Sequence, residues 1–182
     1  MTLEAVILAA GSGSRFGRVT ECQPKALIEL DGEPLLFRMI RQCRAAGVAT
    51  VNIVVGHFAE QVIERVSQEF EEGGFSFIHN DKYQTTNNIL SLAVALDHVG
   101  ERERDHPPEL VVLECDVILD NNVLPLVVAH EAANIAVVSP YVAGLDGTVV
   151  KLAGNLVAEF LPTTKQGVDF DFSATFKTVN VY

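Results

Sequence analysis

Short apolar runs alternate with amphipathic segments through the first part of the chain. The runs are rich in aliphatic residues, which is typical of buried strands, and the expected strands are residues 5–9, 50–55, 75–79 and 110–115. Between them apolar residues recur at helical spacing, and the expected helices are residues 34–47, 59–72 and 87–99. This alternation predicts an α/β fold, a Rossmann-like three-layer α/β/α sandwich with a mostly parallel sheet.

Towards the C-terminus the pattern becomes rich in strands. A further helix is expected after Asp120, and this aspartate is expected to cap it. The strand-like runs that follow residues 121–133 are residues 135–139, 148–152, 156–161 and 178–182, separated by glycine-containing turns. Such hairpins are expected to wall the substrate side of a pocket.

Length and composition favour one domain. The chain has 182 residues, 48% of them hydrophobic, which is enough to bury one substantial core. The charged segment 100–108 is interpreted as a surface loop, so residues 1–182 are expected to form a single domain. Tyr182 ends the sequence inside an expected strand, which favours a domain truncated at its C-terminus.

Charge and hydropathy argue against several classes of partner and location. The net charge of −11, from 24 acidic and 13 basic residues, argues against a nucleic-acid partner, because phosphate backbones require basic surfaces. No apolar run approaches the roughly 20 residues that cross a bilayer, and Glu4 stands where a signal peptide has basic residues. A cytoplasmic protein is therefore expected. The three cysteines fit neither a disulfide framework nor a zinc site.

A glycine-rich segment, LAAGSGSRFG at residues 8–17, directly follows the first expected strand. Glycines let backbone N–H groups approach phosphates closely, and Arg15 could clamp a phosphate with its guanidinium group. A P-loop would end in Gly-Lys-Ser or Gly-Lys-Thr, which is absent. The dinucleotide fingerprint would need a small residue where Phe16 stands, so an NAD-dependent oxidoreductase is the weaker interpretation. A simple turn remains the structural alternative.

Two further residues extend this candidate site. Lys25 follows the loop in the sequence QPKAL and could bring a positive charge back to the same phosphates. Asp116 follows a buried strand, and the carboxyl ends of parallel strands are where open α/β sheets bind ligands. Its carboxylate is a hard oxygen ligand that suits Mg²⁺, although such an aspartate can also cap a helix or form a turn.

In this order, AAGSGSRFG, QPKAL and a helix beginning GEPLL resemble the nucleotidyltransferase family that includes sugar-1-phosphate and phosphocholine enzymes. The resemblance implies that Arg15 and Lys25 neutralise charge as pyrophosphate departs and that Asp116 binds Mg²⁺. It also implies that the glycine loop wraps the triphosphate, with nucleotide-binding residues Leu8, Ala9, Ala10, Gly11 and Gly13.

Two later segments resemble the same family. NDKYQTTNNILSL, residues 80–92, is similar to its base-recognition segment, most closely in the phosphocholine and phosphonate cytidylyltransferase-like branch. This likeness assigns Asn80, Thr86 and Asn87 to the base and favours CTP, although helix capping alone would explain Thr86 or Asn87. KTVNVY resembles the substrate-side strand, which assigns Asn180 to the acceptor.

The resemblance implies a Mg²⁺-dependent enzyme that joins a small phosphorylated acceptor to an NTP, with CTP favoured, and releases pyrophosphate. A phosphocholine-like or phosphonate-like acceptor is ranked first, and a sugar 1-phosphate is the alternative. A noncatalytic nucleotide-binding module and an NAD-dependent oxidoreductase are the alternatives of other classes.

Overall fold

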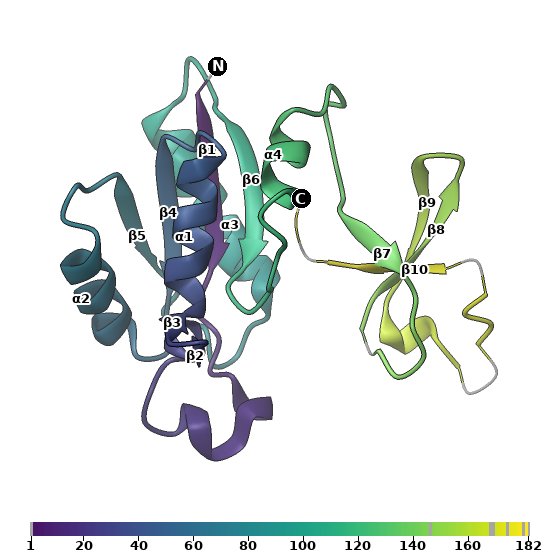
Figure 1. The fold of residues 1–182 in the computed structure, drawn as a ribbon, viewed down its shortest axis with the longest axis horizontal. Helices are drawn as coiled ribbons and strands as arrows, with labels where there is room; N and C mark the ends of the chain where they lie inside the picture. The colour runs from purple at the N-terminus through teal and green to yellow at the C-terminus, as the bar shows by residue number, and fades with distance from the viewer. Residues whose placement is uncertain (1, 146, 168–169, 174, 180, 182) are drawn as a thin grey trace. The chain divides into compact units, whose positions relative to one another are not determined.

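In the computed structural model the chain forms two compact units, Met1–His130 and Glu131–Tyr182 (Figure 1). The structure describes all residues except 1, 146, 168, 169, 174, 180 and 182. The side chains of Arg15 and Phe16 also lie outside the described part. Each unit has its own sheet, and the two are described separately. The expectation that residues 1–182 act as a single domain stays a prediction.

The first unit is built on a four-stranded sheet with the order β5-β4-β1-β6, in which all neighbours are parallel. The strands are β1 (Leu3–Leu8), β4 (Thr50–Val55), β5 (Phe75–His79) and β6 (Glu109–Glu114). Because the strands run in one direction, their carboxyl ends share one edge. The segments that follow them there contain almost all the predicted site residues.

Helices cover both faces of this sheet. They are α1 (Leu35–Ala45), α2 (Ala59–Glu69), α3 (Asn88–Arg102) and the short α4 (Val123–Val128). Figure 1 shows α1 in front of the sheet and α3 behind it. Val6 and Leu8 pack with Ala95 of α3 in one buried cluster, and alternation along β1 turns Ala5 and Ile7, also fully buried, to the other face. The predicted α/β/α sandwich is confirmed.

Most predicted elements are confirmed, and the differences lie at their ends. β4 and β5 begin and end at the predicted residues. α2 stops at Glu69 because Phe70 leaves helical geometry and is buried against Phe37. α3 continues to Arg102, into the segment predicted as a loop, because Arg102 is bound to Glu4 of the sheet.

The helix expected after Asp120 is shorter than the sequence pattern indicated. α4 has only six residues, and Asp120 accepts a hydrogen bond from the backbone N–H of Asn122 just before it, at 3.0 Å. The apolar run after Pro24 begins as a 3₁₀ turn, η2 (Lys25–Leu27), before the small hairpin of β2 (Glu29–Leu30) and β3 (Glu33–Pro34). None of the helices in the described residues has the length and apolarity to span a bilayer.

The second unit contains an antiparallel sheet with the order β7-β10-β8-β9. Its strands are β7 (Val138–Pro140), β8 (Val149–Ala153), β9 (Leu156–Leu161) and β10 (Thr175–Thr178). The strand-rich C-terminal region is therefore confirmed. The last strand was predicted too late, because Phe176 and Lys177 pair with β7 and β8, and the strand ends at Thr178. Asn180 lies outside the described residues.

A buried polar network lies near the amino end of β1. Glu4 is 4% exposed, and its carboxylate accepts hydrogen bonds from Arg102 at 2.6 Å and from Asn52 at 2.9 Å. A buried carboxylate without such partners would be strongly unfavourable. The network therefore ties the last turn of α3 to β1 and β4.

Replacing Arg102 by alanine should lower the free energy of unfolding by about 2 kcal/mol, because the buried Glu4 carboxylate loses its counter-charge; the value is below that of fully buried pairs because the Arg102 side chain is 33% exposed. Urea unfolding monitored by circular dichroism measures the change. Arg104→Ala is the matched control, since Arg104 is exposed in the segment that follows α3. Equal stability of the two variants would contradict this account of the network.

Candidate active site

Backbone hydrogen bonds hold the start of the glycine loop where it leaves β1. The N–H group of Ala9 donates to the carbonyl of Val54 at 2.9 Å, and that of His57 donates to the carbonyl of Ala10 at 3.0 Å. The side chains of Leu8, Ala9 and Ala10 are buried in the core, whereas Gly11 is exposed. Any contact of these first residues with a nucleotide therefore falls to backbone atoms.

Gly13 shapes the next part of the loop. Its φ of 66° lies in the left-handed region, and a Cβ atom there would come within 2.9 Å of the Thr20 methyl group and 3.0 Å of Lys25 Cβ. The Thr20 hydroxyl donates to the Gly13 carbonyl at 3.0 Å. The loop thus packs directly against the stem of Lys25. The Arg15 side chain lies outside the described part of the chain, so its role stays a prediction.

Lys25 and Asp116 form an ion pair. Lys25 belongs to η2, Asp116 follows β6, and their side chains are only 16% and 24% exposed. Partial burial reduces solvent screening, so each charge is felt strongly by its neighbours. The fold therefore brings together a predicted catalytic cation and the predicted metal ligand from distant parts of the sequence.

The chemistry of Asp116 fits a magnesium ion. It offers carboxylate oxygens at the ligand-binding edge of the sheet, and Mg²⁺ in nucleotide enzymes commonly takes one or two carboxylates together with substrate phosphates and water. Within the described ranges, no group of three or more His, Cys, Asp or Glu side chains could hold a metal ion. The neighbouring Cys115 is a poor nucleophile, because burial raises the pKa of its thiol to about 12.

The segment after β5 is organised by Asn80. Its side chain is 2% exposed, donates to the Ser91 hydroxyl at 2.9 Å and accepts from the backbone N–H of Lys82 at 3.0 Å. This amide supports the segment from within and fastens it to α3. The expectation that Asn80 faces a base stays a prediction. In the structure its side chain stabilises the segment that follows β5.

Thr86 and Asn87 both form the turn that precedes α3. The Thr86 hydroxyl donates to the Lys82 carbonyl at 2.7 Å, and the Asn87 side chain caps the helix by accepting from the N–H of Ile89 at 3.1 Å. The capping interpretation of Asn87 is confirmed. Both residues are exposed at the edge where the nucleotide is expected.

Sequence patterns missed a close contact beneath the glycine loop. A Cβ atom on Gly56 would lie 2.9 Å from the Ala10 carbonyl oxygen and 2.9 Å from Tyr83 Cβ and Cγ. The rings of His57 and Tyr83 are 5.8 Å apart. A glycine directly after an aliphatic strand was the available signal, but the identity of its neighbours depends on how three loops meet.

A second missed contact joins Asn88 and Glu114. The Asn88 amide donates to the Glu114 carboxylate at 2.7 Å, linking the first residue of α3 to the last residue of β6. Register places Glu114 opposite Leu8, at the start of the glycine loop. The segment predicted to recognise the base is therefore directly connected to β6, the strand that precedes the predicted metal ligand Asp116.

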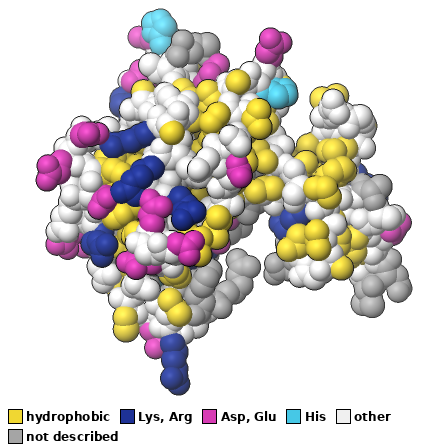
Figure 2. Space-filling model, viewed as in Figure 1, with side chains coloured by type: hydrophobic (Ala, Val, Ile, Leu, Met, Phe, Trp, Pro, Cys, Tyr) yellow, Lys and Arg dark blue, Asp and Glu magenta, His cyan; other side chains and the backbone are white. Residues whose placement is uncertain are grey.

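Other charged features belong to helix packing. Basic and acidic side chains lie interspersed on the face shown in Figure 2. Arg41 is paired with Glu33 and Glu69, Arg44 with Glu72, and both guanidinium groups lie over the Phe70 ring. These arginines are committed to holding α1 and α2 together.

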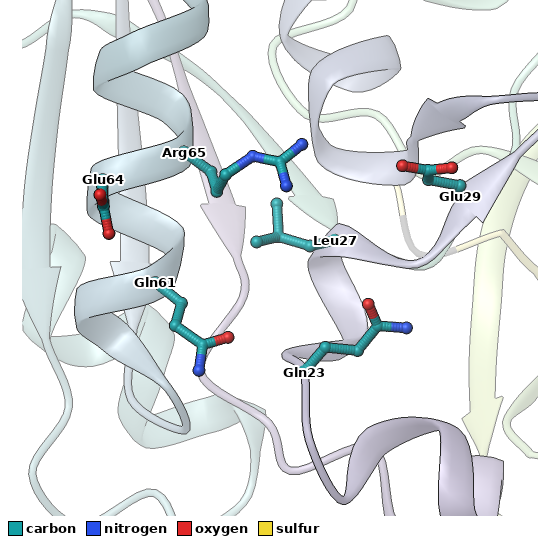
Figure 3. Close-up of a pocket in the computed structure, with 6 residues that line it drawn as sticks. All are labelled: Gln23, Leu27, Glu29, Gln61, Glu64 and Arg65. Carbon is teal, nitrogen blue, oxygen red and sulfur yellow. The ribbon is translucent and has the colours of Figure 1, made fainter.

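A shallow pocket of about 210 Å³ lies between α2 and the segment around Lys25 (Figure 3). It is lined by Gln23, Leu27, Glu29, Gln61, Glu64 and Arg65. None of these is a predicted site residue, although Gln23 and Leu27 flank Lys25 in the sequence.

Comparison with known proteins identifies relatives of this arrangement. A model of the MobA-like NTP transferase domain matches residues 5–167. The chain is 31% identical over 181 residues to the CMP-5'-(3-aminopropyl)phosphonate synthase of Streptomyces rubellomurinus, covering 99% of this chain and 28% of that protein. It is 32% identical over 121 residues to the choline-phosphate cytidylyltransferase of Haemophilus influenzae, covering 66% of this chain and 47% of that protein. The chain thus spans less than half the length of these curated relatives.

A solved structure shares the fold. The CTP:phosphocholine cytidylyltransferase of Streptococcus pneumoniae superposes with a TM-score of 0.67 and 21% identity, covering 100% of this chain and 70% of that one. At this identity the likeness concerns the fold alone. Together with the sequence matches, it confirms the family resemblance indicated by the glycine loop and the QPKAL segment.

Gly13→Ala should lower the free energy of unfolding by about 1–2 kcal/mol, because alanine disfavours the left-handed conformation and its methyl group collides with Thr20 and Lys25. Gly11→Ala is the control, since nothing lies within 4 Å of its added Cβ atom and its φ is ordinary. Thermal unfolding of both variants checks the difference. A Gly13→Ala protein as stable as Gly11→Ala would show that the loop does not pack as described.

Proposed function

The chain belongs to the MobA-like NTP transferase domain family, and we propose that it transfers a cytidylyl group from CTP to a small phosphorylated or phosphonate acceptor. The observation that carries the proposal is the Lys25–Asp116 ion pair beside the glycine loop at the carboxyl edge of the parallel sheet. One cation, one carboxylate and a close-approach backbone loop are the groups that a nucleoside triphosphate requires.

In the proposed reaction an acceptor oxygen attacks the α-phosphorus of CTP. A new P–O bond forms, the bond between the α-phosphorus and its bridging oxygen to the β-phosphate breaks, and pyrophosphate leaves with the electron pair. The acceptor's phosphate or phosphonate oxygen is already anionic near neutral pH, so no general base is required. Catalysis then rests on positioning and charge neutralisation.

Lys25 is proposed to meet the phosphates that depart as pyrophosphate, with Arg15 as a second cation. Gly11 and Gly13 would let the loop backbone approach the triphosphate. Asp116 would hold Mg²⁺, which when bound supplies positive charge to the phosphates and helps to orient them. The buried thiol of Cys115, with its raised pKa, takes no covalent part.

We propose the class of acceptor by analogy with the compounds in the names of the relatives. The two relatives are named for an aminoalkylphosphonate and for choline phosphate, each of which combines a cationic nitrogen, an ammonium or a quaternary ammonium group, with a phosphorus oxyanion. The TNN sequence at the start of α3 supports the same branch, with Thr86 and Asn87 proposed to lie near the base. We therefore rank a phosphocholine-like or phosphonate-like acceptor first and a sugar 1-phosphate second, and Asn180 stays a candidate acceptor contact.

The substrate assignment is tested by pyrophosphate release with Mg²⁺. Each of the four common NTPs is combined with phosphocholine, 2-aminoethylphosphonate or glucose 1-phosphate, and release should occur with CTP and one of the first two acceptors. Release with glucose 1-phosphate instead would favour the sugar alternative. Tight CTP binding without release from any acceptor would favour the noncatalytic module, and NAD binding without NTP turnover would favour the oxidoreductase.

Lys25→Gln and Asp116→Asn should each lower kcat/KM for pyrophosphate release by about 10²–10³-fold, because each removes one charge that acts on the triphosphate. The double variant Lys25→Gln/Asp116→Asn removes both charges together and shows whether an unpaired partner harms folding. Lys165→Gln, an exposed lysine in the second unit, is the charge-matched control. Full activity in a folded Lys25→Gln protein would overturn the assignment of Lys25.

A further inference from the structure

A second carboxylate lies close to the proposed nucleotide site. Glu114 is the last residue of β6, pairs in register with Leu8 and precedes Asp116 by two positions. A carboxylate at this edge repels a triphosphate unless its charge is engaged by another group. Metal binding would be one way to engage it, but a specific protein contact already does so.

That contact is the Asn88–Glu114 hydrogen bond. At 2.7 Å it has the length of a charge-assisted bond, and its donor is the first residue of α3. The amino end of a helix also carries partial positive charge, which favours a carboxylate there. Glu114 is therefore electrostatically matched to α3.

This bond is not needed to form or anchor α3. Asn87 caps the helix, Asn80 bonds to Ser91, and Arg102 binds the buried Glu4 at the opposite end. Asn88 is exposed and Glu114 only half-buried, and a hydrogen bond in such a setting contributes modestly to stability. A contact that adds little to the helix, but joins its first turn to the strand of Asp116, points to a task in the site.

We infer that Glu114 is a positioning residue for nucleotide recognition, acting through Asn88. It fixes the first turn of α3, with Thr86 and Asn87 before it, relative to Asp116 and the start of the glycine loop. The base and the triphosphate of one nucleotide then meet surfaces held at a constant separation. The inference rests on the proposed function and adds a residue that the family resemblance did not assign.

The test measures CTP and UTP binding by calorimetry in Mg²⁺, without acceptor, for Glu114→Ala, Asn88→Ala and the double variant. Each single variant should weaken CTP binding about tenfold, and the double variant should be no weaker than the worse single variant, because both remove the same bond. Discrimination between CTP and UTP should fall in all three proteins.

Glu114→Gln provides the decisive rescue. Its side-chain carbonyl still accepts a hydrogen bond from Asn88, and a neutral bond keeps about half the strength of a charge-assisted one. CTP affinity should therefore stay within about threefold of the original. Glu109→Ala is the control for loss of one acidic charge, because Glu109 lies at the amino end of the same strand. It should bind CTP as the original chain does.

Three outcomes would overturn the inference. Additive losses in the double variant would mean that the two residues act separately. A Glu114→Gln protein as weak as Glu114→Ala would mean that the charge itself acts, on a metal ion or another group. Unchanged CTP affinity and base discrimination with a lower melting temperature would mean a structural role only. If the original chain binds no nucleotide, the proposed function itself fails, and this design separates that result from a failure of the role inferred for the Asn88–Glu114 bond.

Discussion

Parallel pairing of β1 with both β4 and β6 is the constraint on which the site depends. β1 lies inside the sheet, so the loop that leaves it at Leu8 is flanked by the ends of two neighbours. The N–H groups of Ala9 and Cys115 continue the ladder beyond the strands, donating to Val54 and Leu8. The glycine loop and the Asp116 strand therefore hold fixed positions before any ligand arrives, which is what positioning catalysis requires.

Charge distribution gives this edge its chemistry. The chain is acidic overall, with a net charge of −11, so an anionic substrate needs a local exception. We propose that Lys25, whose aliphatic stem packs on Gly13, supplies it, whereas Arg41 and Arg44 take part in the packing of α1 and α2. The placement of a few cations, rather than their number, makes the site suitable for phosphates.

The sequence predicted the sheet better than the contacts between loops. β4 and β5 were located to the residue, because β4 is a buried, largely aliphatic run and β5 an apolar and aromatic run, each with abrupt ends. The ends of α2 and α3 were missed because Phe70 and Arg102 respond to tertiary partners, Phe37 and Glu4, that local periodicity does not contain. Family likeness assigned Lys25 and Asp116 to one site, but their ion pair joins distant segments and was not predicted from the sequence.

The burial of Asn80 and the hydrogen bond from Asn88 to Glu114 show why residue type alone could not divide the tasks within residues 80–92. Neighbouring amides of similar chemistry receive different roles: Asn80 holds the turn from within, Asn87 caps α3, and Asn88 reaches β6. α3 itself is fixed at its far end by the buried Glu4 network. The first turn of α3, where we propose that the nucleotide is recognised, is therefore not the only part of the helix that holds it to the sheet.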